Sequence, residues 1–239
     1  MPLREDDPHV ARIVERLDGL PLALEMAAAQ LHTIGLEDLA DVLDERLTVL
    51  RSPRRSGHER HRDIRSLLEW SESRLTARQA ATLAALAVFA GPVTAADINA
   101  VLGRPDAADD VRELAERSLV TVDITSTPTR FSLLHVVRMH AAERLRDAGR
   151  ADELAERHAR WFLSVARDAD AQLRTPDEER GAQRIESVFG ELRAAQWWAR
   201  SHDVDLAAAL CAHLHLYAHS RLVDEPLQWA EQLCATRDG

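Results

Sequence analysis

Histidine and cysteine are the residue types in this sequence that could bind a metal or form a nucleophile–base pair. The densest histidines are His213, His215 and His219, and the two cysteines are Cys211 and Cys234. On a helix, His215 and His219 share one face, whereas His213 lies about 200° from His215. Two histidines have no obvious third ligand, and the cysteines match no metal or redox spacing. We interpret these residues as core-edge histidines and idle thiols, and we find no recognisable catalytic triad.

Phosphate chemistry is limited by the complete absence of lysine. All 30 Lys and Arg residues are arginine. A G-x-x-x-x-G-K-[ST] phosphate loop therefore cannot occur in this sequence, and the same count excludes a Schiff-base lysine. The sequence also offers no carboxylate placed after a strand to hold Mg²⁺. It predicts that this chain does not hydrolyse ATP by itself.

The run Gly19-Leu20-Pro21-Leu22 lies between two predicted helices. Asp18 and Gly19 end one predicted helix, and Pro21 opens the next. Proline is tolerated at the first helical position because the N–H that it lacks would have no partner there. The run is therefore either a structural helix start or part of a binding surface.

The composition indicates a helical globular protein of one to three small domains. The 239 residues are 46% hydrophobic and 29% charged, with nine glycines and nine prolines. The formal charge of −10 argues against a general nucleic-acid surface, which needs positive potential. No apolar run could span a bilayer, and the acidic start does not have the pattern of a signal peptide. We therefore expect a cytoplasmic protein without membrane contact.

Residues 1–50 are predicted to form a small helical domain, followed by a linker over 51–62. Helices are expected over 9–17, 21–31 and 36–43, and the first has an inward stripe at helical spacing: Val10, Ile13, Val14 and Leu17. The linker contains Pro, Gly and five arginines. It is either a solvated connection or a charged segment that meets an acidic surface.

Residues 63–148 have the element order of a winged helix. Helices are predicted over 63–74, from Thr76 (with Gln79 as its capping-box partner), from Thr94 and over 109–118. Two strands over 119–124 and 130–133 then form a hairpin, and a helix over 134–147 closes the unit.

Residues 149–239 contain only predicted helices, over 152–173, 185–198, 206–218 and 222–233. Short polar turns between them indicate a helical-repeat region. Its tryptophans, Trp161, Trp197, Trp198 and Trp229, are most simply core residues. Because adjacent Trp197 and Trp198 point about 100° apart on a helix, one is expected to be exposed and could mark a partner surface.

Residues 16–25, RLDGLPLALE, strongly resemble the GLPL motif of NB-ARC-type STAND ATPases. These proteins are signal-transduction switches of bacterial transcriptional regulators, apoptosis scaffolds and plant immune receptors. Three later strings fit the same order: SLLEWS at 66–71, AVFAG at 87–91 and LLHVVR at 133–138. The later helices resemble the tetratricopeptide-like sensor region of such regulators. The resemblance implies a mainly α chain with a helical domain, a winged-helix domain carrying one β-hairpin and a helical repeat-like region.

The resemblance also implies nucleotide-facing residues. Pro21, with Leu20 beside it, would pack against the adenine, because a rigid ring at a helix start presents no competing backbone donor. Many members carry Met-His-Asp before the last winged-helix helix, and its histidine senses phosphate. The matching positions here are Leu133, Leu134 and His135, so leucine occupies the sensing position and cannot donate a hydrogen bond. His135 is then the candidate for the phosphate side, or simply a histidine at a helix start.

The family's Walker A, Walker B and sensor segments are expected before residue 1. The resemblance therefore implies ADP or ATP for the full-length protein and no cofactor for this chain alone. The implied partners are the nucleotide-binding domain and, through the helical region, a second copy, a signalling protein or a ligand.

The alternative function is a DNA-binding winged helix. Its reading helix would cover residues 106–117, which carry five acids and two arginines, and the hairpin adds Arg130. Placing this helix against phosphates would be repulsive, so DNA binding is disfavoured.

Overall fold

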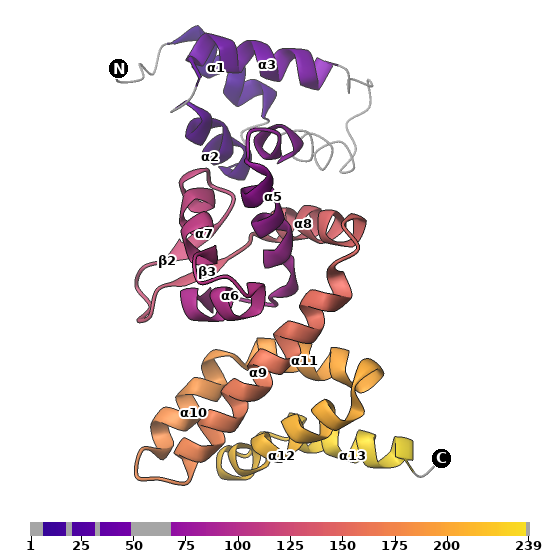
Figure 1. Cartoon of the computed structure of the whole chain (residues 1–239). Coiled ribbons are helices and arrows are strands. Elements are labelled where there is room, and N and C mark those ends of the chain that lie inside the picture. The colour runs from indigo at the N-terminus through magenta and orange to yellow at the C-terminus, as the bar shows by residue number, and fades with distance from the viewer. Residues whose placement is uncertain (1–6, 18–20, 32–33, 49–67, 238–239) are drawn as a thin grey trace.

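The computed structural model describes residues 7–17, 21–31, 34–48 and 68–237. The described chain is mainly helical with a small antiparallel sheet, which confirms the predicted fold class (Figure 1). The predicted linker over 51–62 lies outside the described residues. The predicted domain bounds therefore stay predictions.

The N-terminal helices are α1 (Pro8–Arg16), α2 (Pro21–Gln30) and α3 (Leu36–Thr48). Pro21 begins α2, as predicted. Helix α1 packs against α3, where Leu39 and Leu43 are buried. Ile13 and Leu17 are buried as expected, but Val14 is 41% exposed. The predicted inward stripe was thus too wide.

The central unit consists of helical residues 68–72, α5 (Ala77–Ala85), η1 (Leu86–Val88), β1 (Val93–Thr94), α6 (Ala95–Leu102), α7 (Ala107–Glu116), β2 (Thr121–Asp123), β3 (Arg130–Ser132) and α8 (His135–Asp147). The predicted hairpin is β2–β3, and β1 adds a third strand in the order β1–β3–β2. Val93 and Val122 both pair with Phe131. Sequence reasoning missed β1, because two residues cannot display a strand period.

Two capping boxes fix helix starts in this unit. The Thr76 hydroxyl accepts from the Gln79 amide and the Gln79 side chain accepts in return, as predicted. Thr94 and Asp97 form a second box at α6, where Asp97 is fully buried. Each box satisfies helix-start amides that have no partner within the helix.

The C-terminal helices are α9 (Ala151–Leu173), α10 (Glu178–Ser187), α11 (Phe189–His202), α12 (Val204–Arg221) and α13 (Glu225–Arg237). Figure 1 shows α9 running from the central unit into this group, and α9 packs against α6, α10, α11 and α12. The helix predicted over 185–198 is in fact two helices, because the backbone leaves helical geometry at Val188. Leu222 does not start the last helix: it ends α12 in the left-handed conformation.

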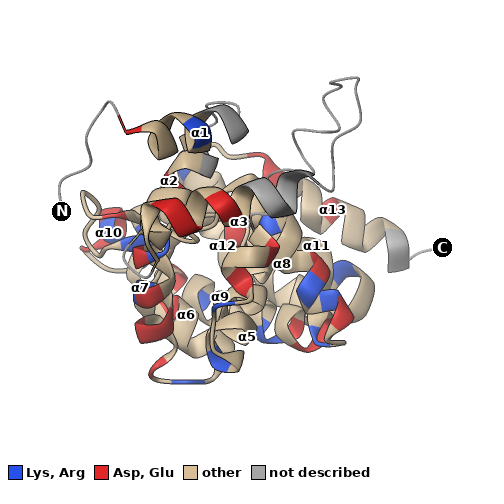
Figure 2. Cartoon of the chain, turned by 90° about the horizontal axis from the view of Figure 1, so that it is seen from above, with Lys and Arg blue, Asp and Glu red and all other residues tan. Residues whose placement is uncertain are grey.

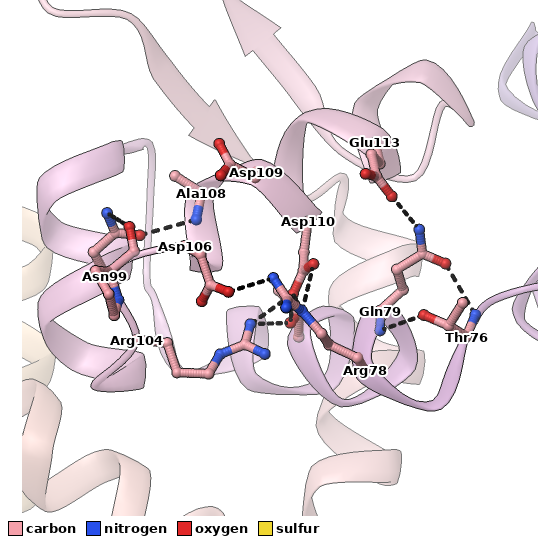
Figure 3. Close-up of polar contacts among 12 residues, drawn as sticks. Thr76, Arg78, Gln79, Asn99, Arg104, Asp106, Ala108, Asp109, Asp110 and Glu113 are labelled. Atoms are coloured by element: carbon pink, nitrogen blue, oxygen red, sulfur yellow. Dashed lines mark hydrogen bonds and ion pairs between the residues drawn. The ribbon is translucent and has the colours of Figure 1, made fainter.

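A polar network holds α7 against α5 (Figure 3). Asp110 is buried and accepts hydrogen bonds from Arg78 (2.9 Å), Arg104 (2.6 Å) and the Thr82 hydroxyl (2.8 Å). Arg78 also pairs with Asp106 at 2.7 Å. Burial by itself raises the pKa of Asp110, but the hydrogen bonds from Arg78, Arg104 and Thr82 outweigh it, and the net pKa is lowered.

Gly181 allows α10 to approach α9 closely. A Cβ atom at this position would lie 2.8 Å from the Ala169 carbonyl oxygen and 3.0 Å from the Leu173 nitrogen. We predict that Gly181→Ala lowers the free energy of unfolding by about 1–3 kcal/mol, because backbone must move. Urea denaturation of the full chain measures this change.

Gly190 provides the matched control, since it is exposed on α11 and a Cβ atom added there would meet no other atom within 4 Å. Gly190→Ala should raise the free energy of unfolding by about 0.5–1 kcal/mol through helix propensity. A stabilising effect at both positions would contradict the close α9–α10 packing.

Asp110 should make stability depend on pH. Its lowered pKa means that its contribution is full above the ordinary carboxyl pKa and is lost as the pH falls below it. We predict that Asp110→Asn costs about 1 kcal/mol of unfolding free energy at pH 7, because the arginines retain access to water. The difference from wild type should shrink between about pH 5 and pH 2.

The control is Asp109→Asn, an exposed neighbour on α7 that pairs with Arg112 at the surface. Urea denaturation at several pH values should show little change for this variant. A pH-independent deficit for Asp110→Asn would contradict the assigned charge pairing.

Candidate functional site

The predicted nucleotide-facing residues lie at two helix starts. Pro21 is the exposed first residue of α2, and His135 is the exposed first residue of α8. Leu134, the N-cap residue of α8, is 40% exposed. Leu20 lies outside the described residues. Within the described part of the chain, no hydrogen bond, ion pair or ring contact joins Pro21 to His135. The nucleotide-facing role of each residue therefore stays a prediction.

A buried polar contact joins α2 to the central unit. The Gln30 side-chain nitrogen, at the end of α2, donates to the Ser71 hydroxyl at 3.4 Å. Both side chains are buried, and the residues are 41 positions apart. The helix that carries Pro21 is therefore anchored at its far end to helical residues 68–72.

The outward face of α7, the helix that would read DNA in the alternative function, is acidic. Asp109, Glu113 and Glu116 are exposed, and Figure 2 shows red along α7. Arg112, the basic residue within α7, pairs with Asp109, while Glu113 accepts from Gln79 (Figure 3). This face repels phosphate and suits a partner surface with positive charge.

The hairpin is equally unsuited to phosphate. Arg130 is half-buried, and its Nη1 donates to the carbonyl oxygens of Pro92 (3.0 Å) and Ser187 (2.9 Å), so this group is engaged within the chain. Hydrogen bonds from the Ser126 and Thr125 hydroxyls lower the pKa of Asp123 to about 2, which keeps a negative charge on the hairpin. Ile124 beside it is 80% exposed.

Glu191 on α11 is a buried carboxylate that reaches back to the central unit. It is 2% exposed and accepts hydrogen bonds from the backbone amides of Ala90 (3.0 Å) and Gly91 (2.6 Å). Its Oε2 atom also lies 2.7 Å from Nε2 of His158 on α9. A carboxylate can be buried when several donors replace water, and three donors do so here.

His158 places this contact in an apolar environment. Its ring is 2% exposed and lies between two aromatic rings, with centroid distances of 5.7 Å to Phe89 and 4.6 Å to Phe162. Electrostatic contacts are stronger where water is excluded, so the pair is held firmly.

Asp97 is the second buried carboxylate between the same two parts. It is fully buried and accepts from the Thr94 amide (2.9 Å) and hydroxyl (2.7 Å) in its own unit. From the C-terminal helices it accepts from Trp161 Nε1 (3.0 Å) and Arg184 (3.3 Å). The start of α6 is therefore tied to both α9 and α10.

A third carboxylate contact joins helical residues 68–72 to α8. Glu72 Oε2 lies 2.8 Å from Nε2 of buried His140 and 3.0 Å from Nε of Arg144. The helix that starts at His135 is thus held by this contact as well as by its packing on α5.

The remaining histidines and cysteines do not form a metal centre in the described residues, where no group of three potential ligands occurs. The ring centroids of His215 and His219 are 4.3 Å apart, while Nδ1 of His213 lies 3.2 Å from Oδ2 of Asp170. Burial raises the pKa of the Cys211 thiol, which keeps it protonated and unreactive.

The expected exposed tryptophan is Trp197, with 77% of its surface accessible on α11. Trp229 is buried, and Trp161 and Trp198 are partly buried. Among the described helices, none is long and apolar enough to cross a membrane.

Sequence reasoning did not single out Glu191 or Asp97. The available signal was an acid at a core position of an amphipathic helix, since such a charge needs partners. The partners of Glu191 at residues 90 and 91 are about 100 positions away, as the contact separations of 101 and 100 show. A local sequence pattern cannot identify them.

The comparisons with known proteins find relatives among mycobacteria. Two proteins named "Putative HTH-type transcriptional regulator", from Mycobacterium tuberculosis and Mycobacterium bovis, are each 34% identical to this chain over 233 residues. The match covers 92% of this chain and 26% of each relative. An "Uncharacterized protein" of M. tuberculosis is 28% identical over 155 residues, covering 62% of this chain and 39% of its own length.

No protein-family model matches the chain, and no solved structure matches it significantly. The chain spans 26% of the regulators' length, so it is similar to one part of much longer proteins.

Proposed function

We propose that this chain is the regulatory and protein-interaction part of a bacterial transcriptional regulator of the STAND type. In this proposal it responds to ADP or ATP only when joined to a P-loop domain, and it does not hydrolyse ATP by itself. The names of the 34% identical relatives support a transcriptional regulator. The GLPL run and the three later strings, in matching order, support the STAND type.

The observation that carries the proposal is the acidic surface of α7 and the hairpin, whose neighbouring arginines are engaged in ion pairs and hydrogen bonds within the chain. Asp110 and Asp106 hold α7 in place through Arg78 and Arg104, and the remaining α7 acids face outward. The one arginine of the hairpin strands donates through Nη1 to two backbone carbonyl oxygens. A winged helix built in this way favours a protein surface over DNA.

The anchoring of α2 and α8 supports a nucleotide-responsive role. Pro21 and His135 are exposed, as ligand-facing residues must be, and each stands on a helix fixed by buried polar contacts. Neither is accompanied by a phosphate-binding lysine, because the chain has none. The phosphate grip would therefore come from the nucleotide-binding domain.

The C-terminal helices are proposed to receive the signal, through a second copy, a signalling protein or a ligand. Trp197 supports this role, since a largely exposed tryptophan is typical of a contact surface. A cytoplasmic location follows from the proposed function.

DNA binding by the chain alone tests the alternative function. We predict no binding tighter than about 0.1 mM to duplex DNA, even at low salt, because α7 presents acids to the phosphates. Fluorescence anisotropy of a labelled random-sequence duplex measures this.

The alternative function would be established by salt-dependent binding that Arg112→Ala and Arg117→Ala both weaken. These substitutions remove the two arginines of the would-be reading helix. Binding that neither substitution affects would place the contact elsewhere but would still overturn the prediction.

Calorimetry with ADP tests the nucleotide part of the proposal. We predict no affinity tighter than about 1 mM for this chain, since the phosphate-binding groups are missing. A longer protein that carries the proposed P-loop domain should bind ADP, and Pro21→Ala should weaken that binding by about tenfold through lost contact with the adenine.

The matched control is Pro8→Ala, because Pro8 is also an exposed first residue of a helix. It should leave ADP affinity unchanged in the longer protein. Micromolar ADP binding by the chain alone would contradict the statement that this chain lacks the phosphate-binding groups. Equal effects of Pro21→Ala and Pro8→Ala on ADP affinity would contradict the role of Pro21.

A further inference from the structure

The turn Phe89–Pro92, between η1 and β1, is held by side chains from three other elements. Glu191 on α11 accepts from the amides of Ala90 and Gly91 at 3.0 and 2.6 Å. Arg138 on α8 donates to the Phe89 carbonyl oxygen. The amides of Ala90 and Gly91 and the carbonyl group of Phe89 therefore have hydrogen-bond partners in distant parts of the chain.

Arg130 on β3 holds the other end of the turn. Its Nη1 atom lies 3.0 Å from the Pro92 carbonyl oxygen and 2.9 Å from that of Ser187, the last residue of α10. The C-terminal helices are therefore connected to this turn twice, directly through Glu191 of α11 and, by way of Arg130, through the Ser187 carbonyl oxygen at the end of α10.

The carboxylate of Glu191 suits this position better than a glutamine side chain would. Its two oxygens accept from two backbone amides and face His158 Nε2, and all these partners are donors or can be. A glutamine offers one acceptor oxygen and an NH₂ group that would confront a donor. The Glu191 side chain is 2% exposed, so its own oxygens depend on these protein donors in place of water.

Arg138 connects the same turn to the start of α8. It stands three residues after His135, so both residues lie at the first turn of α8, on one side of the helix. A displacement of the Phe89 carbonyl oxygen must therefore be accommodated within the first turn of α8.

We propose that the turn Phe89–Pro92 is the junction through which the C-terminal helices set the position of the first turn of α8, with Glu191 as the positioning residue. This inference rests on the proposed function, in which His135 faces the nucleotide. It adds a route by which a partner bound to α9–α13 changes the nucleotide-facing side of the central unit.

The test uses nuclear magnetic resonance on the full 239-residue chain without nucleotide or DNA. In Glu191→Gln we expect the amides of Ala90 and Gly91 to exchange with solvent about tenfold faster or more, and the His135 ring resonances to shift. The matched control is Glu225→Gln, which loses a surface ion pair between α11 and α13 with Arg193. It should leave both readouts at wild-type values.

The proposal is overturned if Glu191→Gln leaves the exchange rates unchanged, or if exchange accelerates while the His135 resonances stay in place. If Glu191→Gln does not fold, the same resonance measurements on Arg138→Lys test the proposal. This variant should shift His135 while Ala90 and Gly91 remain protected, and an unmoved His135 would overturn the proposal. Because no nucleotide is present, failure here is distinct from failure of the ADP prediction.

Discussion

Buried carboxylates that need donors from distant parts of the chain are the constraint on which this structure depends. An unpaired buried charge would cost several kcal/mol, on the order of the whole stability of a domain. Asp110 takes its donors from α5 and from Arg104, Asp97 takes them from α9 and α10, and Glu191 takes them from residues 90 and 91. Each of these acids is satisfied only when two elements have docked, so packing and charge pairing must form together.

The same constraint determines which surfaces remain for function. Arg78 and Arg104 pair with the acids at the start of α7, and the exposed side of α7 carries three acids beside the single arginine of that helix. A helix that reads DNA needs cations to approach the phosphates, and the exposed face of α7 carries more acids than arginines. The arrangement of helices and strands does not by itself decide between a DNA partner and a protein partner, whereas the distribution of charge bears directly on that choice.

The elements that depend on local chemistry could be predicted from the sequence, and those that depend on distant partners could not. Pro21 at a helix start and the Thr76–Gln79 capping box follow from neighbouring residues, and both are present. The break at Val188 has no proline or glycine at the turning residue to announce it, and β1 is too short for a period. The contacts of Glu191 could not be predicted, because their geometry exists only after α9, α11 and the turn at residues 89–92 have packed.

The absence of lysine explains more than the missing phosphate loop. Arginine carries several donors in a planar fork, whereas lysine carries a compact point charge. Arg78 uses this fork to bind Asp110 through Nε and Asp106 through Nη2, and Arg193 binds both oxygens of Glu225 in the same way. One ammonium group could not reproduce these paired directions. The use of arginine in place of lysine therefore supplies paired hydrogen-bond donors that join helices of this chain.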